Sequence, residues 1–218
     1  MPRTIRLAVF VSGEGTTLDG LGEAIDTGRL PAQIGVVVAD RPDIGALDRA
    51  HRRGLPTVVV PLSDRGSAEG PRRLDRELEA HRTELVVLAG FLSILPKDWL
   101  DQWAGRVINV HPALLPKFGG RGFYGRRVHE AVLASGDRET GATVHLVTAA
   151  IDGGPILAQR RLEVRSEDTP ESLRARLHPL EVELLTTTIR RFAEGVWPLP
   201  YRPPPGRPED EARAGAAG

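Results

Sequence analysis

Short apolar runs alternate with amphipathic helical segments through the first half of the chain, and this alternation restricts the fold more than any other feature. Short apolar runs bounded by glycine or polar turns are typical of strands buried on both faces, and their alternation with helices indicates a parallel sheet. The sequence therefore predicts an α/β, Rossmann-like fold in which helices flank a mostly parallel sheet. The predicted strands are 5–11, 34–38, 57–60, 85–89 and 107–111, and the predicted helices are 18–26, 44–53, 71–82 and 96–103.

The pattern changes after Leu115. A glycine-rich loop follows at 117–125. It is long for a compact domain, and such loops are often functional. The remaining predicted elements are a helix at 126–135, strands at 142–148 and 156–164 around a turn at 151–155, and a long helix at 170–194 that Pro179 kinks or divides. They predict a C-terminal antiparallel extension and a long final helix. We expect the Pro-, Gly- and Ala-rich tail, 197–218, to be extended and then partly disordered.

Composition excludes several classes of function. The 29 basic residues balance 29 acidic ones, so the whole chain has no general attraction for nucleic acid or anionic lipid. Cysteine is absent, which excludes disulfides, a cysteine nucleophile and thiolate metal sites. The N-terminus lacks the apolar core of a signal peptide, and no run of about 18 apolar residues is present. We therefore expect a cytoplasmic protein that does not span a membrane.

Two polar residues stand near the end of the predicted strand 107–111. Asn109 and His111 are two positions apart, so a strand places both on the same side. Pro112 cannot donate to a sheet ladder and ends the strand there. Ligands of open α/β sheets bind at the carboxyl ends of strands. We expect either an active site, with Asn109 as hydrogen-bond donor and His111 as acid, or a strand end whose polar groups are merely satisfied.

A glycine loop joins the first predicted strand to the first helix. Gly13 and Gly15 let backbone amides turn outward, the helix N-terminus adds the positive end of its dipole, and Thr16 and Thr17 add hydroxyl donors. This arrangement suits a phosphate, although the loop lacks the third small residue of a dinucleotide fingerprint and the lysine of a P-loop. The alternative is a strand–helix turn that needs glycine for its shape alone.

Asp152 lies in a glycine-rich turn downstream, where it either caps the turn or folds back near His111. A neighbouring carboxylate raises an imidazole pKa, and Asn, His and Asp together are able to stabilise an oxyanion and move a proton. No serine pairs with His111, which favours direct transfer between two bound substrates. His145 is either a core histidine or a wall of the site. No histidine pair has metal-ligand spacing, so no metal is expected.

Read together, these segments resemble the phosphoribosylglycinamide formyltransferases, a family of folate-dependent enzymes of purine synthesis. The resemblance runs from Arg6 to about Trp197 in the family's order. The motifs that carry it are Ser12-Gly13-x-Gly15-Thr16, Val86-Val87-Leu88-Ala89-Gly90-Phe91-Leu92, Asn109-Val110-His111-Pro112-Ala113-Leu114-Leu115-Pro116, Gly141-x-Thr143-Val144-His145 and Asp152-Gly153-Gly154-Pro155.

The resemblance implies that Asn109, His111 and Asp152 are the catalytic residues. The amine of 5-phosphoribosylglycinamide would attack the formyl carbon of 10-formyltetrahydrofolate, which is a co-substrate. Asn109 and protonated His111 would stabilise the oxyanion, and Asp152 would keep His111 charged and relay a proton. The family's fold implies one domain, 1–196, with a phosphate-binding half, 1–104, and a catalytic and folate-binding half, 105–196.

The resemblance also implies the substrate contacts and partners. Residues matching the family's acceptor site are Gly13, Gly15, Thr16, Thr17 and Glu181, and those matching its folate site are Leu92, Ser93, Ile94, Leu95, Asn109, Thr148 and Ile151. We expect small-molecule substrates, a monomer or homodimer, and no partnership with nucleic acid or membrane.

The chain departs from the family pattern at several positions. Thr17 stands where Asn is common, and Ser93 stands where an Arg is often found near the folate; another folate-contacting Arg would fall near 71–73. The glycine-rich loop 119–125 is longer than in many members. Four alternatives stay open: a methionyl-tRNA formyltransferase, a formyltransferase acting on a sugar amine, a formyltetrahydrofolate hydrolase, and a non-catalytic nucleotide-binding module.

Overall fold

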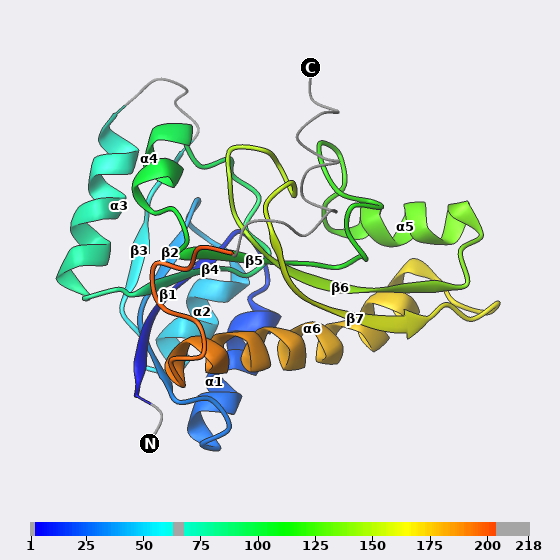
Figure 1. Ribbon diagram of the computed structural model, residues 1–218, viewed down its shortest axis with the longest axis horizontal. Coiled ribbons are helices and arrows are strands. Elements are labelled where there is room, and N and C mark those ends of the chain that lie inside the picture. The colour runs from blue at the N-terminus through cyan, green and yellow to red at the C-terminus, as the bar shows by residue number, and fades with distance from the viewer. Residues whose placement is uncertain (1–2, 63–67, 204–218) are drawn as a thin grey trace.

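The computed structural model describes residues 3–62 and 68–203. These residues form one seven-stranded sheet with helices on both faces (Figure 1). The strand order is β3-β2-β1-β4-β5-β6-β7; β1 to β5 are parallel, and β6 and β7 are antiparallel to their neighbours. The predicted Rossmann-like class, its antiparallel extension and its long final helix are confirmed. The strands are β1 Ile5–Val11, β2 Ala32–Ala39, β3 Thr57–Val59, β4 Leu85–Leu88, β5 Val107–His111, β6 Glu139–Leu146 and β7 Ile156–Glu163.

Helices cover both faces because the central strands are apolar on both. Leu7 and Val9 of β1 belong to a core shared with three helices, whereas Ala8 and Phe10, which point the other way, belong to a second core. The first core packs against α1 Thr16–Asp26, α2 Gly45–Arg52 and α6 Pro170–Ala193, and the second against α3 Glu69–Ala80 and α4 Lys97–Gln102; the remaining helix is α5 Arg126–Ser135.

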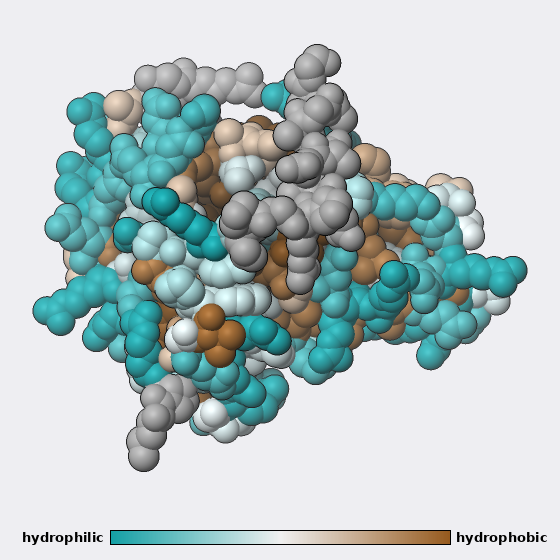
Figure 2. Space-filling view, viewed as in Figure 1, coloured by the Kyte–Doolittle hydropathy of each residue, from teal (hydrophilic) through white to brown (hydrophobic). Residues whose placement is uncertain are grey.

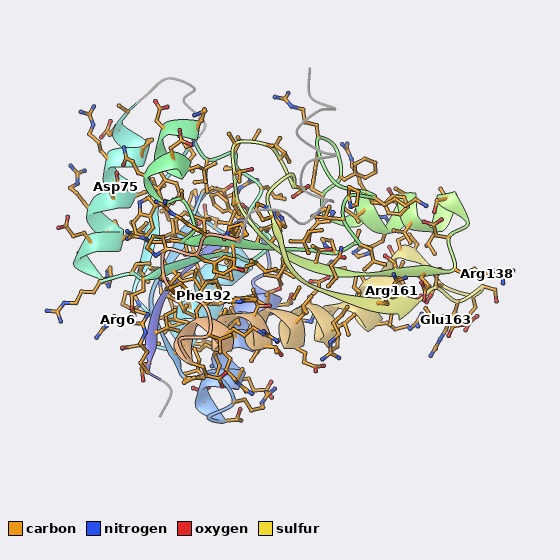
Figure 3. All side chains as sticks on the ribbon, in the orientation of Figure 1. Arg6, Asp75, Arg138, Arg161, Glu163 and Phe192 are labelled. Atoms are coloured by element: carbon orange, nitrogen blue, oxygen red, sulfur yellow. The ribbon has the colours of Figure 1, made fainter. Side chains whose placement is uncertain are left out.

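The final helix, α6, is one uninterrupted helix of 24 residues, so Pro179 does not divide it. Its start is well specified: Thr169 and Ser172 form a reciprocal capping box, and Pro170 occupies the first turn, where no backbone donor is needed. Phe192, near its end, points from α6 toward the sheet (Figure 3) and is fully buried. The helix therefore holds the antiparallel strands and α1 together from one face.

The first residues of the predicted tail pack on the core. Trp197 and Tyr201 make edge contacts with Phe192 at ring-centroid distances of 5.3 and 6.1 Å, and the Tyr201 amide donates to the Gly105 carbonyl at 2.9 Å. This part of the tail has no regular secondary structure but is anchored. The disorder expected farther on concerns residues 204–218, which lie outside the described residues.

Element boundaries differ from prediction mainly at β6. This strand begins at Glu139 rather than 142, because it pairs with β7 along its whole length, as far as Glu139 with Glu163. The far end of this β6–β7 pair is strongly charged, with Arg138, Arg161 and Glu163 at its tip (Figure 3). The face in view is largely hydrophilic, and apolar side chains reach it near the centre (Figure 2). None of the described helices is both long and apolar enough to cross a bilayer.

Candidate active site

Loops that follow the parallel strands enclose a cleft of about 650 Å³ at the sheet's carboxyl edge. Asn109, His111 and Asp152, which the sequence singled out, all line it, together with His145. So do all the residues that match the family's folate site: Leu92, Ser93, Ile94, Leu95, Asn109, Thr148 and Ile151. Leu92, Ile94 and Ile151 are exposed apolar side chains, so the cleft has apolar walls and a polar floor. This combination is typical of a small-molecule site.

His145, whose role the sequence left open, belongs to this floor. The antiparallel pairing of β5 with β6 sets His145 opposite Asn109, and the Asn109 Nδ2 to His145 Nε2 distance is 3.0 Å. His145 Nδ1 lies 2.8 Å from the Leu146 carbonyl oxygen, so Nδ1 carries the hydrogen and Nε2 accepts one from the Asn109 amide. His145 therefore orients Asn109, and among the described residues the second amide hydrogen has no hydrogen-bond acceptor.

His111 is 4% exposed and is hydrogen-bonded through one of its two ring nitrogens. Nε2 donates to the Phe118 carbonyl oxygen at 2.7 Å, and Nδ1 lies 3.7 Å from Asp152 Oδ2. Burial lowers the pKa of His111 below its ordinary 6.5, although Asp152 and the Phe118 carbonyl oppose this shift. Desolvation thus outweighs the carboxylate in the ligand-free protein, and the expectation that Asp152 keeps His111 charged stays a prediction for the site with its substrates bound.

Asp152 connects both histidines to the glycine-rich loop. One oxygen, Oδ2, accepts a hydrogen bond from the Gly120 amide at 2.9 Å, and the other, Oδ1, lies 3.6 Å from His145 Nε2. Burial opposes its ionisation, but His145, His111 and Gly120 together lower its pKa, so the carboxylate is ionised. A Cβ at Gly119 would lie 2.4 Å from Leu115 Cδ2 and 3.2 Å from Asp152 Cβ, so the loop passes close to Asp152 at this glycine.

The glycine loop after β1 turns directly into α1, and its last position requires glycine. Gly15 precedes α1 with φ +74°, and a Cβ there would lie 2.7 Å from the Ala46 backbone. Neither Gly13, Gly15, Thr16 nor Thr17 lines the 650 Å³ cleft; the loop is joined to it through Ser12, whose hydroxyl accepts a hydrogen bond from the Leu92 amide at 2.8 Å. The structure thus places this loop beside the cleft.

Other predicted site residues lie outside the cleft lining. Glu181 is on α6, where burial raises its pKa to about 7 against the opposing charge of Arg174. Residues 71–73, where a second folate-contacting arginine was expected, lie on α3 and line an adjoining cavity of about 1090 Å³. Across the described ranges 3–62 and 68–203, no three His, Asp or Glu side chains gather closely enough to hold a metal ion.

The balance between burial and Asp152 predicts how His111 titrates. NMR titration of the ligand-free protein should give His111 a pKa below 6.5, and Asp152→Asn should lower it further, because the opposing negative charge is lost. Because the pKa of His111 is lower in the folded protein than in the unfolded chain, its contribution to the free energy of unfolding is fully present above about pH 6.5. This contribution is lost as the pH falls through the folded pKa. Asp168→Asn, which removes another buried carboxylate outside the cleft, should leave the His111 pKa unchanged. A His111 pKa above 6.5, or a rise in Asp152→Asn, would contradict this balance.

Comparison with known proteins identifies the family. The formyl transferase family matches residues 5–189. The chain is 39% identical over 190 residues to the chloroplastic phosphoribosylglycinamide formyltransferase of Arabidopsis thaliana, covering 84% of this chain but only 65% of that relative, just under two thirds of its length. It is 33% identical over 192 residues to the phosphoribosylglycinamide formyltransferase of Escherichia coli (strain K12), covering 88% of each. The solved structure of the Coxiella burnetii phosphoribosylglycinamide formyltransferase superposes with a TM-score of 0.81 at 36% identity, over 88% of this chain and 89% of that one. The chain belongs to the formyl transferase family.

Proposed function

We propose that this chain transfers the formyl group of 10-formyltetrahydrofolate to the amine of 5-phosphoribosylglycinamide. The observation that carries the proposal is the convergence of Asn109, His111 and Asp152 on one apolar-walled cleft beside a glycine loop. The names of the relatives support the reaction and the acceptor. The substrates are small molecules, and we retain the predictions of a cytoplasmic monomer or homodimer that binds no nucleic acid.

Each substrate has a place in this proposal. The pterin of the folate enters the cleft between 92–95 and 148–151, with the formyl group toward Asn109. The acceptor phosphate binds at the N-terminus of α1, where the amides and hydroxyls of Gly15, Thr16 and Thr17 are donors and the helix dipole favours an anion. The two sites adjoin at Ser12 and Leu92, which lets the acceptor amine reach the formyl carbon.

In this proposal His111 acts first as a base and then as an acid, which two contacts of its ring support. Its Nε2 hydrogen is held by the Phe118 carbonyl, and 3.7 Å is too long for a hydrogen bond between Nδ1 and Asp152, so the Nδ1 lone pair is free to accept the proton of the attacking amine. Asp152 then stabilises the imidazolium. The free hydrogen of the Asn109 amide is donated to the oxyanion of the tetrahedral intermediate.

The transfer completes when this intermediate collapses. The new bond joins the acceptor nitrogen to the formyl carbon, and the bond from that carbon to the folate nitrogen breaks. The proton taken from the amine passes from His111 Nδ1 to the departing folate nitrogen, so His111 returns to its neutral state. No covalent enzyme intermediate is required, in keeping with the partners of His111 within residues 3–62 and 68–203, among which no serine or threonine hydroxyl is found.

An acceptor panel tests the proposed function. Release of deformylated folate, followed by absorbance, should require 5-phosphoribosylglycinamide and should be much weaker with its dephosphorylated form, a sugar amine or water. Thr16→Ala should raise KM for the phosphorylated acceptor about tenfold, the scale of one charge-assisted hydrogen bond, with little effect on KM for folate. Rapid turnover without an amine would indicate a hydrolase, and equal effects of Thr16→Ala on both KM values would contradict the phosphate site.

His111 and Asp152 should control the chemical step. We expect His111→Ala and Asp152→Asn each to lower kcat by about 100-fold or more, the range of acid–base and oxyanion effects, while KM changes less. His51→Ala, which changes an exposed histidine at the end of α2, is the matched control and should keep kcat. Near-normal kcat in either site variant would reject the assigned roles.

A further inference from the structure

Asp40 is a buried carboxylate that the reaction described above does not use. It directly follows β2, and its side chain is 1% exposed. One oxygen, Oδ2, accepts hydrogen bonds from two serine hydroxyls: Ser12 Oγ at 2.8 Å and Ser93 Oγ at 2.7 Å. Arg41 Nε and Nη2 donate to Oδ1 and Oδ2, each at 3.1 Å. Four hydrogen bonds thus converge on a carboxylate that lies between loops.

The two serines come from the loops that hold the two substrates. Ser12 begins the glycine loop after β1, and Ser93 lies in the loop after β4 that walls the folate cleft. The Leu92 amide also donates to Ser12 Oγ at 2.8 Å, which ties the loops directly. The Asp40 carboxylate and the Ser12 hydroxyl therefore connect the ends of three parallel strands through one buried and two partly buried hydrogen bonds.

A carboxylate suits this position for a chemical reason. Both serine hydroxyls donate to it, and Ser12 also accepts from Leu92, so the group between the serines must be an acceptor. Burial opposes the ionisation of Asp40, but Arg41, Ser93 and Ser12 outweigh it and hold the pKa of Asp40 below its ordinary value. An asparagine would keep an oxygen for the serines but would present its NH₂ group to the Arg41 guanidinium.

We infer that Asp40 is a positioning residue that couples the binding of the two substrates, because its carboxylate and the two serines fix the glycine loop relative to the folate-binding loop. This inference rests on the proposed function, which assigns one substrate to each loop. A substrate that holds its own loop in the binding conformation also restrains the other loop through Asp40, so the second substrate binds at a lower entropic cost. Each substrate therefore raises the affinity of the protein for the other, and by thermodynamic linkage the two factors are equal.

The coupling factor measures this role. Calorimetry gives the Kd of 5-phosphoribosylglycinamide without and with saturating tetrahydrofolate, which is the deformylated product. The coupling factor is the Kd without tetrahydrofolate divided by the Kd with it. We expect tetrahydrofolate to tighten acceptor binding about fivefold or more in the unaltered protein. Asp40→Ala should bring the factor close to one, whereas Asp40→Asn, which keeps an acceptor for both serines, should retain most of it.

Asp168→Ala is the matched control. Asp168 is also a buried carboxylate, 3% exposed, that accepts from a serine hydroxyl and an arginine, Ser172 and Arg176, but it lies outside the cleft before α6. Its replacement should lower Tm and leave the coupling factor unchanged, which separates coupling from general stability. If Asp40→Ala does not fold, Ser93→Ala removes one of the two serine bonds and should reduce the factor.

The outcomes separate the inference from the proposed function. An unchanged coupling factor in Asp40→Ala or Ser93→Ala, or an equal loss in Asp168→Ala, would overturn the role of Asp40 while both ligands still bind. An Asp40→Asn factor as low as that of Asp40→Ala would show that the serine bonds do not carry the coupling. If the unaltered protein binds neither ligand, the proposed function fails, and the inference that rests on it fails as well.

Discussion

The antiparallel pairing of β6 with β5 is the constraint on which the site depends. It sets His145 opposite Asn109, and it reverses the chain so that the segment after β6 returns over the strand end. The return is closed by the Leu146 amide, which donates to the Pro155 carbonyl at 2.9 Å. Asp152 lies within this closed segment, close to both His111 and His145. A parallel neighbour would not bring this segment back beside β5.

Burial lowers the pKa of His111 and the charge of Asp152 raises it, and burial is the larger effect. The ligand-free protein therefore keeps a neutral imidazole beside an ionised carboxylate. This arrangement suits the proposed reaction, in which a proton is first taken from an amine and then given to a folate nitrogen, because a neutral imidazole accepts the first proton and the imidazolium donates it. Asp152 raises the pKa of the imidazole without making it permanently charged.

The sequence predicts the fold well, because each central strand is an apolar run and each helix has its own periodicity. It also predicts that Asn109 and His111 face one cleft, since a strand repeats every two residues. The role of His145 depends on the register between β5 and β6, which a single sequence does not specify. The Phe118 carbonyl contact depends on the path of the glycine-rich loop, where Phe118 adopts φ +57°. Asp40 was missed because its partners, Ser12 and Ser93, come from loops far apart in sequence.

In the proposed reaction the formyl carbon passes directly from folate to the acceptor amine at the end of β5. The most direct measurement is carbon-13 NMR of the protein with 10-[¹³C]formyltetrahydrofolate and 5-phosphoribosylglycinamide in ¹⁵N-labelled form at its amine. We predict that the label appears in one product, an amide in which carbon-13 couples to nitrogen-15, at the rate at which the formyl-folate signal disappears. Label recovered as free formate, or carbon-13 bound to a protein side chain before product forms, would contradict direct transfer.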